Sequence, residues 1–393
     1  MKPTRFKNKI CFWLAKLALI AIPWTASTSF ADPLPMGWTS VRALGMGNAY
    51  VSVVDNEDSL FYNPAGLARV SGVNWTVFDI GAGLNGPEAL EAAMQLQKIK
   101  DEMASTINNL YGKKVWIGAG GKTAVTVPYF GAAGFATGEA GYFQQNPANP
   151  RLNLNYYFDY GVAFGSAIDF VPGILSVGLT ARRVNRTGTT SILGPGSLAT
   201  LDGASFESEL KRRGTGYGVD FGATLRIPGP VSPAFSFVYR NLGDTAFSHD
   251  EGAGAPPSIK GEMIVGASMQ ISGPLITITP AFDYRYMNYA KVGTGKNINL
   301  GVEIDLPLID LRAGLHQGYY TLGAGVSLGI LRADVATWGV ELGEYAGQHE
   351  DRRYMAQITF ELGFDPGRFG FGSSSSSGGA NKSGERRRLK QRR

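Results

Sequence analysis

Charged side chains recur at every second position along several segments of this chain, and they are the residues that could do chemistry. The acids among them are Asp159, Asp220, Glu262, Asp283, Glu303, Asp305, Asp310, Asp334 and Glu361, and the bases are Arg182, Arg226, Arg240, Arg285, Arg312, Arg332 and Arg353. Two carboxylate pairs, Asp283 with Glu303 and Asp305 with Asp310, have the residue types of general acid–base catalysis. Nothing in the sequence places a leaving group between them, and acids and bases nearly balance. The pattern therefore favours mutual ion pairs, with a charged surface that selects a solute as the alternative.

Other chemical signatures are missing from the sequence. The histidines His249, His316 and His349 are scattered and lack metal-ligand spacing. There is no GxSxG, P-loop or HExxH motif, and residues 45–48 carry a glycine pair without the preceding strand that a dinucleotide-binding loop requires. The single cysteine is Cys11. We therefore predict a protein that is not an enzyme and that uses no cofactor and no metal ion.

The charged residues belong to segments in which apolar and polar side chains alternate. Residues 298–306 alternate strictly, with Glu303 and Asp305 on the polar face. Successive side chains of a strand point to opposite faces, so such a segment is a strand with one apolar and one polar face. The same reasoning places Tyr284 and Tyr286 together on the apolar face of another strand.

The composition agrees with a chain built of such strands. Glycine makes up 53 of the 393 residues and charged residues only 18%, and dense glycine disfavours helices. About fourteen segments alternate over about ten residues each, which is the length of a tilted strand that crosses an outer membrane with its apolar face outward. We predict an all-β fold, a transmembrane antiparallel β-barrel over residues 73–364. It would contact the lipids of a Gram-negative type of outer membrane, and its polar faces would line the lumen.

The connections between these segments alternate in length. Short turns follow the even-numbered strands, at 170–173, 228–233, 272–274, 307–308 and 329–331. Longer connections follow most odd-numbered strands, as in outer-membrane barrels with short periplasmic turns and long external loops. Apolar residues at helical spacing predict helices in two long loops, residues 87–110 and 197–213. We expect these helices to pack on the barrel rim, and a lid or partner surface is the alternative.

The two ends of the chain carry its positive charge. Residues 1–31 combine a basic start, an apolar stretch and small residues before the cleavage site, which is typical of a signal peptide. Residues 365–393 are predicted to be a flexible, Ser/Gly-rich, basic tail on the periplasmic side. We expect a solvated tail, with contact to anionic lipid or an acidic partner as the alternative. Because the bases lie at the ends, the net charge of +5 does not indicate nucleic-acid binding.

The segment between the signal and the first strand, residues 32–72, is too irregular for a membrane strand. It contains the runs RALGMGNAYV, starting at Arg42, and FYNPAGLA, starting at Phe61. Together they resemble the N-terminal hatch of FadL-like outer-membrane proteins. That superfamily includes long-chain fatty-acid and hydrocarbon transporters and the PorV-type and TraF-like barrels. The run from Tyr239 to Asp244 resembles the PorV/TraF-like branch.

The resemblance implies a barrel with an N-terminal lumen plug that transports small hydrophobic molecules across the outer membrane. The alternative function is a protein-interaction barrel that serves a secretion or envelope assembly. The expected partners are therefore membrane lipids and either a hydrophobic small-molecule ligand or an envelope or secretion protein, but no nucleic acid. The plug and ligand path would involve Gly45, Gly47, Asn63, Pro64 and Ala65.

Physical reasons support a bent plug at these five positions. Glycines allow tight bends in a crowded lumen, and an Asn-Pro step favours a turn. The structural alternative is that these residues only shape the plug. The apolar residues available for a ligand are Tyr157, Trp338, Met94 and Met103.

Overall fold

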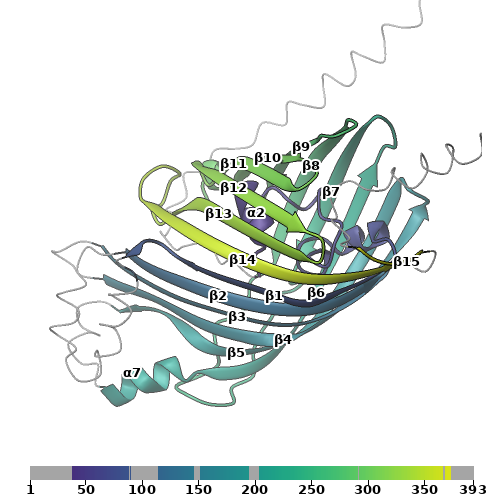
Figure 1. Cartoon of the computed structure of the whole chain (residues 1–393). Coiled ribbons are helices and arrows are strands. Elements are labelled where there is room, and N and C mark those ends of the chain that lie inside the picture. Colours follow the sequence, from purple (N-terminus) through teal and green to yellow (C-terminus); the bar gives the residue numbers. More distant parts are fainter. Residues whose placement is uncertain are drawn as a thin grey trace, which may run out of the picture.

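The protein is a closed barrel of antiparallel strands. The computed structural model describes residues 38–87, 89, 114–145, 151–193, 203–290, 292–365 and 368–372. In these residues β1 to β14 follow one another around the sheet in chain order, and β1 pairs with β14, which closes the barrel (Figure 1). Closure leaves no free sheet edge among these strands. The predicted all-β fold and the strand number are therefore confirmed.

The strands are of unequal length. The longer ones are β1 (Val73–Leu84), β2 (Lys114–Val127), β3 (Phe130–Gln145), β4 (Arg151–Val171), β5 (Leu175–Leu193), β6 (Arg213–Arg226) and β14 (Glu350–Asp365). The shorter ones are β7 (Val231–Arg240), β8 (Glu262–Ser272), β9 (Thr277–Tyr284), β10 (Ile298–Asp305), β11 (Ile309–His316), β12 (Tyr319–Leu328) and β13 (Leu331–Glu341). Since the long strands are neighbours, one side of the barrel wall is taller than the other (Figure 1).

The alternation of the sequence decides which side chains face outward. Phe164 is 61% exposed and Leu322 51%, whereas Asp283 on the opposite face is fully buried. An apolar exterior around a polar lumen is the reverse of a soluble protein and suits a barrel surrounded by lipid. The chain is therefore an outer-membrane type of β-barrel. Among the described residues, no helix is both long and apolar enough to cross a membrane.

The connections have the predicted rhythm. The turns after β2 and β12 consist of residues 128–129 and 329–330, whereas the connections after β1 and β5 span 85–113 and 194–212. The short turn at Gln317–Gly318 is the exception after an odd-numbered strand, and both residues have positive φ, as in a tight hairpin turn. We take the end with the short turns as periplasmic and the other as external.

Some expectations from the sequence need correction or lie outside the described residues. Tyr286 does not share the outer face with Tyr284. β9 ends at Tyr284, and Tyr286 has φ 55° and is only 4% exposed, because the chain turns inward there. Within the expected flexible tail, β15 (Arg368–Gly372) pairs with β14.

Two loops are expected from the sequence to contain helices. The loop of residues 197–213 contains α7 (Gly203–Leu210). The loop of residues 87–110 lies outside the described residues except for Pro87 and Ala89. The predicted signal peptide and the rest of the tail also lie outside them.

Residues 38–72, which we call the N-terminal segment, form no strand and run inside the barrel (Figure 1, purple). The segment contains α2 (Val41–Gly45), α3 (Ser59–Tyr62) and the 3-10 helix η1 (Pro64–Arg69). Helix α2 contacts β11 to β14, and η1 contacts β3 to β6. Their apolar residues pack against small lumen-facing residues of the wall, such as Ala124 and Ala163. Apolar burial in this protein is therefore concentrated in the lumen.

The first prediction concerns the outward face. Replacing Leu322 of β12 by Arg places a charge in lipid, so we expect the free energy of unfolding to fall by about 2–4 kcal/mol at membrane midplane depth. The same change at Ser327, on the lumen side of that strand, should cost much less. Urea unfolding in lipid vesicles measures both variants, and equal losses would show that the strand register is wrong by one residue.

Candidate functional site

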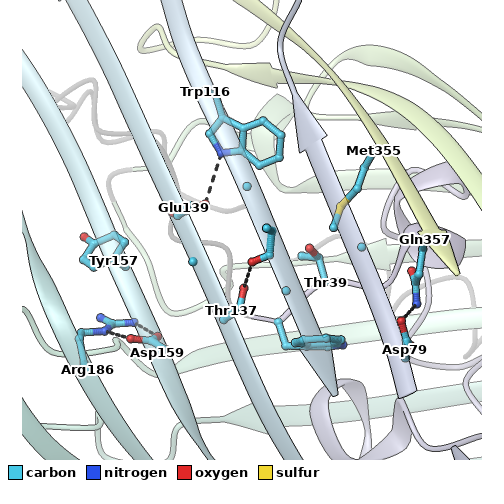
Figure 2. Close-up of a pocket in the computed structure, with 16 residues that line it drawn as sticks. Thr39, Asp79, Trp116, Thr137, Glu139, Tyr157, Asp159, Arg186, Met355 and Gln357 are labelled. Carbon is cyan, nitrogen blue, oxygen red and sulfur yellow. Dashed lines mark hydrogen bonds and ion pairs between the residues drawn. The ribbon is translucent and has the colours of Figure 1, made fainter. Parts of the chain in front are cut away.

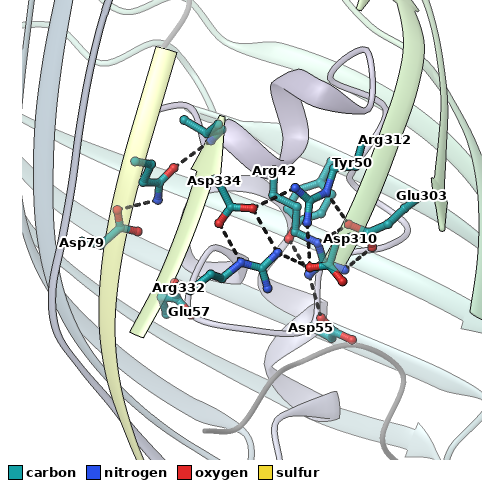
Figure 3. Close-up of polar contacts among 12 residues, drawn as sticks. Arg42, Tyr50, Asp55, Glu57, Asp79, Glu303, Asp310, Arg312, Arg332 and Asp334 are labelled. Atoms are coloured by element: carbon teal, nitrogen blue, oxygen red, sulfur yellow. Dashed lines mark hydrogen bonds and ion pairs between the residues drawn. The ribbon is translucent and has the colours of Figure 1, made fainter. Parts of the chain in front are cut away.

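A buried network of ion pairs fastens the N-terminal segment to the barrel wall (Figure 3). Arg42 of α2 donates from Nε and Nη2 to the two oxygens of Glu303 on β10, at 2.8 and 2.5 Å. Arg312 of β11 donates to the same carboxylate at 2.6 Å. Paired arginine–carboxylate contacts of this kind are directional and strong. Glu303 therefore joins the segment and the barrel through one side chain.

The network continues along the wall toward the periplasmic end. Arg312 also contacts Asp334 at 2.8 Å and Asp310 at 3.1 Å, and Arg332 contacts the same two carboxylates at 2.6 and 2.8 Å. Each of these acids thus has two basic partners. Asp305 lies opposite Asp310 in the β10–β11 register, but no hydrogen bond holds its Oδ1 within the described residues. Glu303, Asp310 and Asp334 therefore serve as ion-pair partners of arginines.

The second carboxylate pair considered from the sequence is not brought together. Asp283 of β9 accepts from the backbone N–H groups of Tyr50 and Val51, at 2.8 and 3.2 Å. Its register partner on β10 is Asn299, whereas Glu303 lies opposite Thr279. Asp283 therefore binds the N-terminal segment independently of Glu303, and the pair offers no acid–base site.

Other wall residues also bind the backbone of the N-terminal segment. Thr321 donates to Gly45 O at 2.9 Å, and Arg285, itself paired with Glu262, donates to Asn48 O at 3.4 Å. Within the segment, burial raises the pKa of Tyr62 to about 12, which keeps its hydroxyl neutral. The hydroxyl oxygen accepts a hydrogen bond from Ser40 N at 3.2 Å. These contacts satisfy backbone groups that water would otherwise have to reach.

The glycine pair of the first run allows a very close approach to the wall. A Cβ atom on Gly47, where φ is +64°, would lie 2.2 Å from Leu300 O, and one on Gly45 would lie 3.0 Å from the Cα of Gly323. No larger residue fits at Gly47 without displacing a barrel strand. The role of the pair is thus contact between backbones.

The turn of the second run is seated on β5 and β6. Asn63 Oδ1 accepts from Ala65 N at 3.1 Å, and Asn63 Nδ2 donates to Val51 O and to the hydroxyl of Thr224 on β6. A Cβ on the facing Gly178 would lie 2.4 Å from the carbonyl carbon of Pro64. Asn63, Pro64 and Ala65 therefore shape and anchor the segment, and Ala65 also lines a small hollow between the segment and the wall near the periplasmic end.

The remaining predicted charges line the lumen at several heights. Asp220 accepts from Arg182 at 2.8 Å, and Arg240 contacts Glu262 at 3.4 Å. Near the periplasmic end, the half-buried Arg226 donates to Ser52 O at 3.1 Å. Glu361 is half-buried on β14.

One ion cluster in the lumen escaped the sequence reasoning. The fully buried Lys122 of β2 contacts Asp58, Glu57 at 3.1 Å and Asp79 at 3.3 Å. Gln357 of β14 also donates to Asp79. The feature of the sequence that could have indicated this cluster is a lysine inside a glycine-rich strand. Its three acidic partners come from two other elements, so spacing alone could not assemble them.

A pocket opens in the external half of the lumen, beside the ion-paired core (Figure 2). The wall contributes Trp116 of β2, Glu139 of β3, Tyr157 of β4 and Met355 of β14, and the N-terminal segment contributes Trp38. All four wall residues lie in the halves of their strands that lead to external connections. The hollow is partly open to solvent, and several of its walls are aromatic. Aromatic walls with a few polar groups are typical of sites for small organic molecules.

Two of the apolar residues singled out from the sequence belong to this region. Tyr157 lines the pocket, and Trp338 packs edge-on behind Trp116, with ring centroids 5.7 Å apart. Met94 and Met103 lie outside the described residues. Trp116 and Trp38, which the sequence reasoning did not select, are the main aromatic contributions. No group of three metal-ligating side chains occurs in the part of the chain that the structure describes.

Comparison with known proteins identifies the architecture. No family model and no curated protein matches the chain. Among solved structures, the TodX monoaromatic hydrocarbon channel matches in two mutants, deltaS2 and deltaS2S3. Each is 12% identical, with a TM-score of 0.51 over 83% of this chain and 99% of that chain. The Ralstonia pickettii toluene transporter TbuX gives a TM-score of 0.48 at 12% identity, over 82% and 97% of the two chains.

The fold is that of the FadL-like barrels. A sequence identity of 12% supports a shared fold but does not support a shared ligand. The FadL-like resemblance noted in the sequence is thereby confirmed for the barrel. The ligand of the pocket therefore has to be inferred from the side chains that line it in this chain.

The second prediction tests the Lys122 cluster. Replacing Lys122 by Met leaves buried carboxylates without their cation, so we expect the free energy of unfolding to fall by about 3–5 kcal/mol. Adding Asp58→Asn should restore part of the loss. The control is Lys114→Met on the same strand, where a half-buried lysine donates to Glu350 O, with an expected loss of about 1 kcal/mol or less. Urea unfolding in detergent measures all three, and similar losses for K122M and K114M would contradict the role of the cluster.

Proposed function

We propose that the protein transports small hydrophobic molecules across the outer membrane through this barrel, with the N-terminal segment as a plug. The observation that carries the proposal is the aromatic pocket in the external half of the lumen. A molecule arriving from outside meets Trp116, Tyr157 and Trp38 before it meets the ion-paired core. An apolar molecule gains from leaving water at such a surface.

The structural neighbours support the same class of function. Their printed names describe monoaromatic hydrocarbon channels, and they share the closed barrel. The protein-interaction alternative has no comparable observation in the described residues. It would lead us to expect a protein partner on the external surface and no dependence of function on the pocket.

Transport requires the N-terminal segment to move. In the structure it lies inside the lumen and is held by Glu303, Asp283 and Lys122 through charged contacts. In our proposal this arrangement is the closed state. A displacement that breaks some of these contacts, while the β1–β14 ladder stays closed, would open a path below the pocket.

The third prediction tests the pocket. Thr137 of β3 faces it and donates to Ala119 O, so Thr137→Phe fills the hollow with a ring. We expect uptake of radiolabelled toluene by cells that express the variant to fall by about tenfold. The control is Thr123→Phe, the same substitution on the exposed outer face of β2. If T137F and wild type take up toluene equally, the pocket is not on the transport path.

The fourth prediction tests the movement of the plug. The sequence has a single cysteine, Cys11, in the expected signal peptide, so new cysteines can be paired selectively. Ser52 of the N-terminal segment accepts at its carbonyl oxygen from Ser268 Oγ of β8 at 3.2 Å. The variant S52C/S268C should lose uptake when it is oxidised and recover it with a reductant.

The matched control for this variant is N185C/T215C. Its two positions pair across β5 and β6, with Thr215 Oγ1 2.8 Å from Asn185 Oδ1, and their disulfide would leave the segment free. This variant should transport in both redox states. Full uptake by oxidised S52C/S268C, with the cross-link verified by mass spectrometry, would show that the segment need not leave β8.

A further inference from the structure

Glu139 differs from the other charged residues around the pocket. Its Oε2 atom accepts from the indole Nε1 of Trp116 at 3.4 Å, which is long for a hydrogen bond. No ion pair involves Glu139 within the described residues. A half-buried carboxylate whose nearest donor is one distant indole retains much of its capacity to accept hydrogen bonds.

The neighbouring charges are already committed to other partners. Arg186 holds Asp159 with two bonds of 2.8 and 2.7 Å. Arg353 donates to Asp351 at 2.8 Å. Asp79, at the edge of the pocket, is bound by the Lys122 cluster. The two arginines therefore pair with their own aspartates, and Glu139 is a carboxylate at the pocket that has no ion-pair partner among the described residues.

Aromatic surfaces adjoin this carboxylate. Trp116 and Tyr157 line the pocket with Glu139 between them in chain order, and Figure 2 shows all three around the same hollow. Arg353 lies over the ring of Trp116, 4.4 Å from its centroid, and Arg186 lies 4.6 Å from that of Tyr157. These contacts hold both rings in place. The pocket thus combines an apolar aromatic surface with one acceptor of negative charge.

We infer that the pocket binds small aromatic molecules that carry one hydrogen-bond-donating group, an ammonium or a hydroxyl, and that Glu139 accepts that group. The inference rests on the proposed function and narrows its substrate class. A plain hydrocarbon would cover the carboxylate with apolar surface and leave it without a new partner, which is unfavourable. A donor on the ring compensates for the water that Glu139 loses, and a cationic donor does so most strongly.

The experiment compares benzylamine, benzyl alcohol and toluene at pH 7. Binding to the full-length protein in detergent is followed by its tryptophan fluorescence in sealed cuvettes. Wild type should bind benzylammonium at least about tenfold more tightly than toluene, with benzyl alcohol between them. Glu139→Gln keeps the shape and an acceptor for Trp116. It should abolish the preference for the cation and raise toluene affinity, because the bound ring then covers no charged carboxylate.

Two controls keep the result specific. Asp169→Asn removes a carboxylate near the periplasmic end, where Asp169 accepts from Ser176 at 2.6 Å, and it should leave all three affinities unchanged. Heat-modified migration on gels verifies that each variant is folded. If toluene binds but no preference exists, or if E139Q weakens all three ligands equally, the inference about Glu139 is overturned and the proposed function stands. If none of the three binds, the proposed function itself is overturned.

Discussion

One carboxylate, that of Glu303, ties the inner and outer parts of this molecule together. It receives Arg42 from the N-terminal segment and Arg312 from the barrel, and all three side chains are buried. An unpaired charge at this depth would cost several kcal/mol. The segment and the wall therefore stabilise each other, since removing the segment takes one of the two arginine partners from Glu303, and removing Glu303 takes two hydrogen bonds from Arg42. The position of α2, and with it the floor of the external pocket, follows from this constraint.

The high glycine content serves the same close contact. Where the segment touches the wall, glycines on both sides allow backbones to meet, as between Gly45 and Gly323. Side chains at these points would separate the two layers and break the short polar contacts beside them. A composition that first suggests only strands thus also reflects a lumen filled by a second layer of chain.

The barrel was predictable from the sequence because its signal is local and periodic. Outward residues such as Leu322 alternate with inward residues such as Glu303, and the lengths of the connections distinguish the two ends. Tyr286 shows the limit of this signal. Apolar and polar residues continue to alternate in the sequence after β9 has ended at Tyr284, and only the backbone conformation shows that the chain turns there.

Partnerships inside the lumen could not be predicted in the same way. Lys122 meets Glu57 and Asp58 only when the segment lies inside the closed barrel. The pocket combines side chains from β2, β3, β4 and β14 that are up to about two hundred and forty residues apart in the chain. Because each of these residues looks unremarkable within its own strand, the binding chemistry emerges only from closure of the sheet.

The closing pair, β1 with β14, joins the first and the last of the barrel strands. The N-terminal segment immediately precedes β1, so it is available before the final strand pairs. Threading a segment that carries Arg42, Asp58 and several helical turns into an already sealed cylinder would strip these groups of water before they reached their partners. The lower-energy order of assembly is for the sheet to wrap around the segment and seal last. The segment then acts as an internal template, and the order of elements in the chain encodes the order in which the protein is built.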